Sequence, residues 1–281
     1  MKRIYYICLA LGFMFSSVTF VSCGSDDGKT NPENTNPGGS NSGSGKDSKP
    51  KKTADRDEAG NIKINAVNFP DAVFRGYLYD KYGSDGVLSN AEIDNVTQLS
   101  LSNKGIKTLE GIEFFPLLEK LYCFDNQLTS LDVTENIALI ELRCFRAKLT
   151  SLDVSKNKAL KELYCSDNQL TSLDVSKNTR LTSLYCYNNQ LTSLDVSKNT
   201  GLNYLSCGYN QLTSLDVSKN TGLYYLYCSD NQLTSLDVSK NTKLTSLECQ
   251  SNRLTYIDVS KNTKLTSLSC DHNITVIGWP K

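Results

Sequence analysis

Cysteine recurs at a fixed interval along most of this chain. Eight cysteines share a spacing of 21 residues: Cys123, Cys144, Cys165, Cys186, Cys207, Cys228, Cys249 and Cys270. A sequence period of this length is typical of solenoids, in which each repeat forms one coil. The 281 residues therefore predict a stacked array instead of two ordinary globular cores.

Each repeat reads Leu-x-x-Leu-x-Cys-x-x-Asn-x-Leu-Thr-Ser-Leu-Asp-Val-Ser-Lys-Asn. Its few apolar positions cannot offset the entropy lost in ordering the whole repeat, so a single copy should not fold alone. Within one copy, the segments that begin at Leu181 and Leu191 have the same spacing. This internal similarity predicts a flattened right-handed solenoid with parallel sheets on two opposite sides, and neither half is long enough for a helix.

A different pattern precedes the repeats, over residues 61–95. Apolar residues at helical spacing follow Pro70 and Asp71, and Ser89 with Glu92 forms a capping-box pattern. The segment 81–92 resembles a degenerate EF-hand loop, but Lys81 occupies a ligand position, which argues against tight calcium binding. We predict a small helical cap that covers the first coil.

The N-terminus has the features of an export signal. Lys2 and Arg3 precede an apolar run that ends at Cys23, which resembles a bacterial lipobox. We predict a signal peptide over 1–22, lipidation of Cys23 and a disordered linker over 23–60, hence an outer-membrane lipoprotein exposed on the cell surface. Ordinary signal cleavage and a retained membrane anchor are the alternatives. The acidic pair Asp26-Asp27 fits either an export tag or the start of the linker.

The first eleven repeat positions resemble the leucine-rich repeat consensus, with cysteine in place of one aliphatic residue. With the helical cap, residues 96–277 resemble the internalin-type bacterial surface proteins, in particular those with a cysteine ladder. The resemblance implies a mainly β, leucine-rich repeat solenoid over 96–281. It also implies adhesion to host or matrix proteins, without naming a receptor.

The repeated cysteines and asparagines are predicted to be structural. Inward cysteines on successive strands lie along one line, whereas a zinc site needs four sulfurs around one point. In-register side chains also run parallel, which disfavours disulfides. We therefore predict free, buried thiols and no metal or other cofactor. Two rows of asparagine should satisfy backbone groups at the corners, and Ala147 interrupts the first row.

The repeats differ mainly on one predicted face. Their second halves repeat Ser, Asp and Lys almost unchanged, which indicates a solvated face or, less simply, a row of aspartates that binds cations. The first halves place aromatic residues outward beside Arg143 and Arg146, and we predict that these aromatics bind a partner: Tyr122, Phe124, Phe145, Tyr164, Tyr185, Tyr187, Tyr204, Tyr225 and Tyr227. Cross-strand stacking that only stiffens the sheet is the structural alternative.

Composition excludes several functions. Lys and Arg number 30, as do Asp and Glu, so no basic surplus supports nucleic-acid binding. The chain has a single histidine, His272, and histidine is the side chain that most readily exchanges protons near neutral pH, so acid–base catalysis is not favoured. We therefore predict a non-enzymatic module that binds a host or bacterial protein, with a glycan as the alternative ligand. Contact with membrane is predicted only through the N-terminal lipid.

Overall fold

The computed structural model describes residues 53–279. They belong to one compact unit, which spans Lys52–Lys281. The predicted signal peptide and the lipidation of Cys23 lie outside the described residues. Within 53–279, no helix has both the length and the apolar character needed to cross a membrane.

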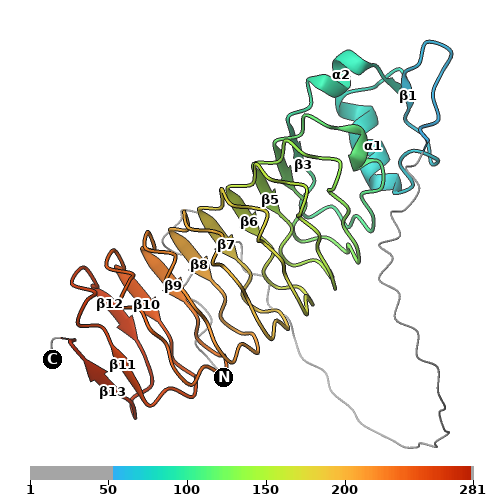
Figure 1. The fold of residues 1–281 in the computed structure, drawn as a ribbon. Helices are drawn as coiled ribbons and strands as arrows, with labels where there is room; N and C mark the ends of the chain where they lie inside the picture. The colour runs from blue at the N-terminus through green and yellow to red at the C-terminus, as the bar shows by residue number, and fades with distance from the viewer. Residues whose placement is uncertain (1–52, 280–281) are drawn as a thin grey trace, which may run out of the picture. The chain divides into compact units, whose positions relative to one another are not determined.

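A small cap precedes the first coil (Figure 1). Its elements are β1 (Ile62–Lys63), α1 (Ala72–Lys81), β2 (Val87–Leu88) and α2 (Asn90–Asp94), and β1 pairs with β2 in antiparallel fashion. Asp71 caps α1 by accepting hydrogen bonds from the backbone of Val73 and Phe74. The predicted capping box is present at α2, where Ser89 and Glu92 hydrogen-bond reciprocally.

The cap is tied both to the first coil and to the segment before it. Asp71 Oδ2 accepts a hydrogen bond from the Lys107 amide at 2.8 Å. The fully buried Phe69 packs edge-on against Phe114 of the 3-10 helix η1 (Ile112–Phe114). Upstream, the Asp55 amide donates to Asn68 Oδ1 at 2.8 Å, so the folded cap includes residues that the sequence places in the linker.

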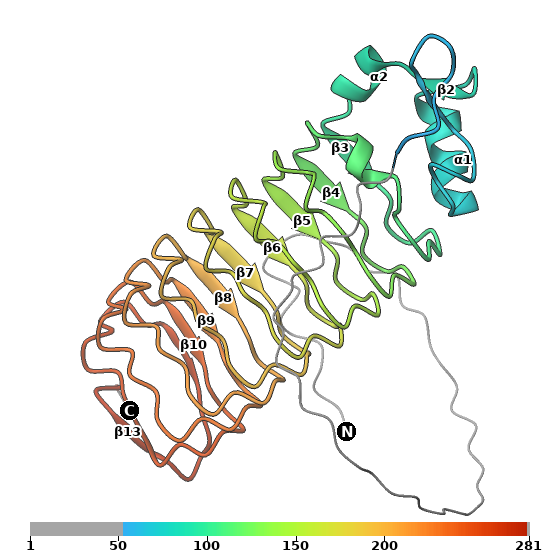
Figure 2. The ribbon, with the colours of Figure 1, turned by 45° about the vertical axis from the view of Figure 1, so that its right-hand side comes forward.

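A parallel sheet of nine strands runs along one side of the coils (Figures 1 and 2). In chain order its strands are β3 (Gln98–Ser100), β4 (Lys120–Tyr122), β5 (Glu141–Arg143), β6 (Glu162–Tyr164), β7 (Ser183–Tyr185), β8 (Tyr204–Ser206), β9 (Tyr225–Tyr227), β10 (Ser246–Glu248) and β12 (Ser267–Ser269). The central leucine of each strand pairs with that of the next, as Leu163 does with Leu184. The chain therefore forms a leucine-rich repeat solenoid with few helices.

The core fills the inside of every coil. In one representative coil Leu184, Cys186, Leu191 and Val196 have no exposed surface. Cysteines 123 to 249 are buried and Cys270 is half-buried, and all eight are free. The prediction of free, buried thiols is therefore confirmed for all but the last coil.

The predicted second sheet on the opposite side is much shorter than expected. Among residues 53–279, that side contains an isolated bridge between Asp132 and Asp153 and one pair of parallel strands at the C-terminal end, β11 (Tyr256–Asp258) and β13 (Thr275–Ile277). A backbone turn follows each Leu-Asp-Val segment. The Val154 carbonyl accepts from the Asn157 amide at 3.0 Å, and the Val259 carbonyl accepts from the Asn262 amide at 2.9 Å in the coil that contains β11, so this turn is compatible with both paired and unpaired segments.

Asparagine side chains connect the coils on this second side. Asn157 Nδ2 donates to the carbonyls of Val133 and Asn136 in the preceding coil, both at 2.9 Å, and the pattern repeats along the array. At the other corner, Asn168 donates to Cys144 and accepts from the Leu149 amide. The structural role predicted for both asparagine rows is confirmed.

Candidate functional site

The outer surface of the nine-stranded sheet gathers most of the aromatic and charged variation between repeats. We call it the sheet face and define it as the outward side chains of the strands together with the two residues that follow each cysteine. The alternation of a strand places these side chains outside because the leucine and cysteine between them point into the core. The face therefore consists of parallel rows, with one residue from each coil.

One row forms a continuous stack across four strands. Tyr122, Arg143, Tyr164 and Tyr185 occupy paired positions on β4 to β7. The Arg143 guanidinium carbon lies 5.2 Å from the Tyr122 ring centroid and 4.6 Å from that of Tyr164. The rings of Tyr164 and Tyr185 stack at 4.7 Å with an interplanar angle of 5°. The stack is thus built from cation–π and aromatic contacts that neighbouring coils supply.

A buried carboxylate supports this stack. Glu141 is 7% exposed, accepts a hydrogen bond from the Tyr122 hydroxyl at 2.9 Å and forms an ion pair with Arg143. Burial, followed by the hydrogen bond to Glu141, raises the pKa of Tyr122 to about 12. Burial and the hydrogen bond to Glu162 likewise raise the pKa of Tyr164. These phenols therefore remain neutral hydrogen-bond donors at physiological pH.

A second row begins with another stacked pair. The ring centroids of Phe124 and Phe145 lie 4.4 Å apart, and the two ring planes are inclined by 7°. Beside them Arg146 reaches Asp125 at 3.7 Å and Asp167 at 3.9 Å. Arg146 adopts a left-handed backbone with φ of 49°, which is unfavourable for a side chain of this kind. The equivalent residues of other coils, such as Asp125 and Asp167, have the same left-handed backbone, so this coil departs from the common repeat in side-chain charge and not in backbone conformation.

The predicted partner-binding residues differ in how much of each side chain is exposed. Half-buried positions are occupied by Tyr122, Phe124, Phe145, Tyr164, Tyr185, Tyr187 and Tyr225. Tyr204 is 42% exposed, whereas Tyr227 is only 2% exposed. Tyr227 covers Gly208, where an added Cβ would lie 2.4 Å from a ring carbon. Tyr227 therefore belongs to the packing beneath the face and offers almost no surface to a partner.

Sequence reasoning did not include two exposed tyrosines near this region. Tyr209 is 48% exposed and its ring centroid lies 6.4 Å from that of Tyr227, while Tyr224 is 40% exposed. Tyr209 follows Gly208 at the left-handed position, where other coils have Asp167 or Asn188. A departure from the common residue at that position was the signal that could have identified it.

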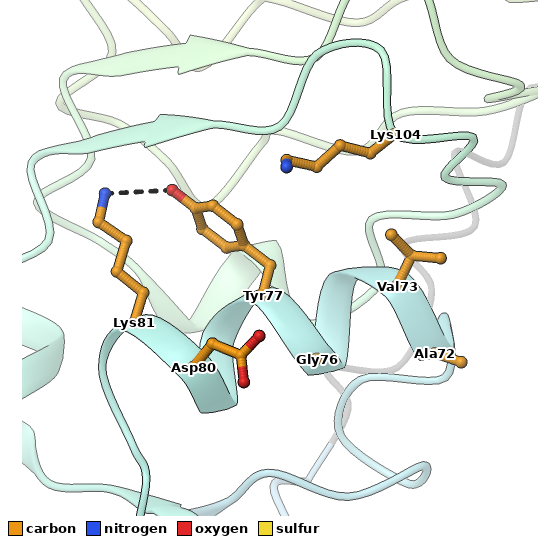
Figure 3. Close-up of a pocket in the computed structure, with 7 residues that line it drawn as sticks. All are labelled: Ala72, Val73, Gly76, Tyr77, Asp80, Lys81 and Lys104. Carbon is orange, nitrogen blue, oxygen red and sulfur yellow. Dashed lines mark hydrogen bonds between the residues drawn. The ribbon is translucent and has the colours of Figure 1, made fainter.

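A separate pocket of about 570 Å³ lies beside α1, and Figure 3 shows its lining. Lys81 Nζ donates to the Tyr77 hydroxyl at 3.1 Å, and Lys104 Nζ lies 5.4 Å from the Tyr77 ring centroid. Asp80 lines the same pocket. Since the polar groups at its centre already bond to each other, the pocket is a weaker candidate than the sheet face.

The described residues contain no cluster of three or more His, Cys, Asp or Glu side chains that could hold a metal ion. In the degenerate EF-hand segment, Glu92 is committed to its capping box, where its carboxylate accepts from the Ser89 amide and hydroxyl. Burial raises the pKa of the Cys123 thiol to about 12, so it is a poor nucleophile at neutral pH. The arrangement therefore favours binding over chemistry.

Comparison with known proteins agrees with this fold. Residues 158–199 match the family model described as "Leucine Rich repeats (2 copies)". No curated protein matches the chain.

Several solved structures are similar. The functional domain of InlJ from Listeria monocytogenes, whose description includes a cysteine ladder, is 32% identical, with 78% of this chain and 62% of that chain covered and a TM-score of 0.49. This chain therefore spans less than two thirds of the InlJ chain. Internalin C2 from Listeria monocytogenes is 25% identical, with 75% and 97% covered and a TM-score of 0.69. The leucine-rich repeat protein LIC12759 of Leptospira interrogans is also 25% identical, with 65% and 51% covered and a TM-score of 0.61.

Proposed function

We propose that the protein is a non-enzymatic recognition module that binds a protein partner through the sheet face. The observation that carries the proposal is the row of Tyr122, Arg143, Tyr164 and Tyr185, because Tyr and Arg are the residues that dominate protein interfaces. Adjacent coils hold these side chains in fixed stacks. A partner would therefore bind them with little loss of side-chain entropy.

The stacking geometry favours a protein over the alternative glycan ligand. A sugar binds aromatic residues by covering an open ring face. The facing surfaces of Phe124 and Phe145 cover each other, as do those of Tyr164 and Tyr185. Each of these rings thus has one face covered by its stacking partner, which leaves less open ring face for a sugar, whereas a protein surface can also contact ring edges.

Attachment to the cell surface is part of the same proposal. Cys23 follows an apolar segment and would carry the lipid of an outer-membrane lipoprotein. The polar linker would then hold the folded unit away from the membrane. Metabolic labelling with a fatty-acid analogue should mark the protein but not its Cys23→Ala variant, and equal labelling of both would refute lipidation.

The decisive experiment compares surface variants against arrayed host and bacterial proteins and a glycan array. Replacing Tyr164, Tyr185 and Tyr204 together by alanine should reduce binding to the protein partner at least tenfold. Tyr256→Ala is the matched control, because this tyrosine is 54% exposed on β11, outside the sheet face. Unchanged binding by the triple variant, or a ligand found only among glycans, would contradict the proposal.

A further inference from the structure

The two sides of the solenoid differ in charge. On the second side, aspartate and lysine alternate in nearly every repeat, as Asp195 with Lys198 and Asp216 with Lys219, so the charges balance locally. The sheet face carries an acidic surplus: Asp125, Glu141, Glu162, Asp167, Asp230, Glu248 and Asp271 against Lys120, Arg143 and Arg146. The neutral chain is therefore polarised, with excess negative charge on the sheet face.

This surplus is greatest toward the C-terminal end. From β7 to β12 the sheet-face positions include Asp230, Glu248 and Asp271, while neither Lys nor Arg occurs at them. The Tyr225 hydroxyl donates to Glu248 Oε1 at 3.0 Å and so orients the carboxylate without neutralising it. Burial and the negative charge of Asp271 raise the pKa of Asp230. A cation placed here would relieve this repulsion.

The other end of the face shows how these groups hold a cation. Arg143 lies between the rings of Tyr122 and Tyr164 and forms an ion pair with Glu141. Around β8 to β10 the same kinds of side chain recur, with Tyr225 hydrogen-bonded to Glu248 and Tyr209 to Asp230. At this end, however, the sheet-face positions supply no arginine of their own.

We propose that the C-terminal half of the sheet face, from β8 to β12, binds an arginine- or lysine-rich segment of the protein partner. This inference rests on the proposed function and adds the chemistry of the occupant. The partner's guanidinium groups take the place that Arg143 holds at the other end. They contact tyrosine rings and pair with Asp230 and Glu248.

The test uses two synthetic peptides of equal length, one alternating arginine with glycine and the other alternating glutamate with glycine. Fluorescence anisotropy with the full chain should show binding of the arginine peptide, weakened by added salt, and at least tenfold weaker binding of the glutamate peptide. Asp230→Asn combined with Glu248→Gln should weaken the arginine peptide at least fivefold. The charge-matched control on the second side, Asp195→Asn with Asp216→Asn, should change its affinity less than twofold.

Three outcomes would overturn the proposal: no preference for the arginine peptide, equal losses in the sheet-face and second-side variants, or no loss in the sheet-face variant. The proposed function fails separately, when the tyrosine triple variant keeps full binding to the partner found by array. If that variant loses its partner while the arginine peptide shows no preference, the sheet face remains the binding surface and only its basic occupant is refuted.

Discussion

Tyr227 lies over Gly208 of the preceding coil, so closely that a Cβ at position 208 would meet the tyrosine ring at 2.4 Å. The contact explains why Tyr227 is only 2% exposed, although it belongs to the sheet face. Glycine is required here for close approach, since any larger residue must displace the ring.

Gly208→Ala should therefore destabilise the fold by about 1–2 kcal/mol through overpacking, and should move Tyr227 into solvent. Urea unfolding measures the first effect and near-ultraviolet circular dichroism the second. Gly201→Ala is the control, because its Cβ would meet nothing closer than the Leu181 carbonyl at 3.5 Å. Equal stability of the two variants would contradict the packing described.

Ala147 interrupts the first asparagine row, and filling the gap should stabilise the protein. In the next coil Asn168 Oδ1 accepts from the Leu149 amide at 3.1 Å. The equivalent Leu128 amide has no acceptor among the described residues, although Leu128 is fully buried. Ala147→Asn should supply one and raise the free energy of unfolding by about 1 kcal/mol.

Removing the asparagine of the next coil provides the comparison for this prediction. Asn168→Ala should lower the free energy of unfolding by about 1–3 kcal/mol, because it leaves buried backbone groups unpaired. If Ala147→Asn instead lowered stability, the corner around position 147 would have to be closed by other contacts.

Arg143 should not tolerate replacement by lysine. The planar guanidinium contacts the rings of Tyr122 and Tyr164 while pairing with the buried Glu141, and an ammonium group cannot reproduce this geometry. Arg143→Lys should cost about 1 kcal/mol in chemical unfolding. An unchanged midpoint would show that the stack contributes little to stability.

Asp71 should make the stability of the cap depend on pH. Its burial alone would raise the pKa, but hydrogen bonds from the backbone amides of Lys107, Phe74 and Val73 outweigh burial and lower the pKa below 3.8. The ionised form therefore stabilises the fold at neutral pH. This contribution is lost as the pH falls from 3.8 through the folded-state pKa.

Asp71→Ala should consequently be about 1–2 kcal/mol less stable at pH 7, and the difference should shrink at strongly acidic pH. Asp71→Asn retains the N-cap acceptor without the charge and should lie between the two. Thermal unfolding of all three proteins across this range tests the prediction. A difference that stayed constant with pH would exclude a role for the charge.

The sequence predicted the coils well because eight cysteines and the leucines around them recur every 21 residues with little variation. Leu184 and Cys186 are inside since strand alternation and the 21-residue period leave no other arrangement. The short extent of the second sheet could not be foreseen from Leu194 and Val196, whose spacing matches that of the first strand. The turn from the Asn199 amide to the Val196 carbonyl also occurs in the coil that contains β11, so the repeated spacing does not distinguish the coils that pair on this side from those that do not.

The candidate site was predictable in its rows but not in its individual exposures. Alternation placed Tyr185 and Tyr227 on the same face, yet their exposure depends on which residue the adjacent coil supplies. Tyr185 stacks on Tyr164, whereas the ring of Tyr227 packs against Gly208. Such contacts between coils become visible only once the stacking register is known.

The central claim is that every coil turns its cysteine inward and its strand aromatics outward, and thiol reactivity tests it most directly. The folded protein is treated with iodoacetamide near pH 8, and peptide mass spectrometry reads each cysteine separately. Cys123 to Cys249 should stay unmodified until guanidinium unfolds the chain, because burial raises their pKa values. The half-buried Cys270 should react first. Rapid labelling of Cys186 in the folded protein, or a disulfide between any two of these residues, would contradict the account.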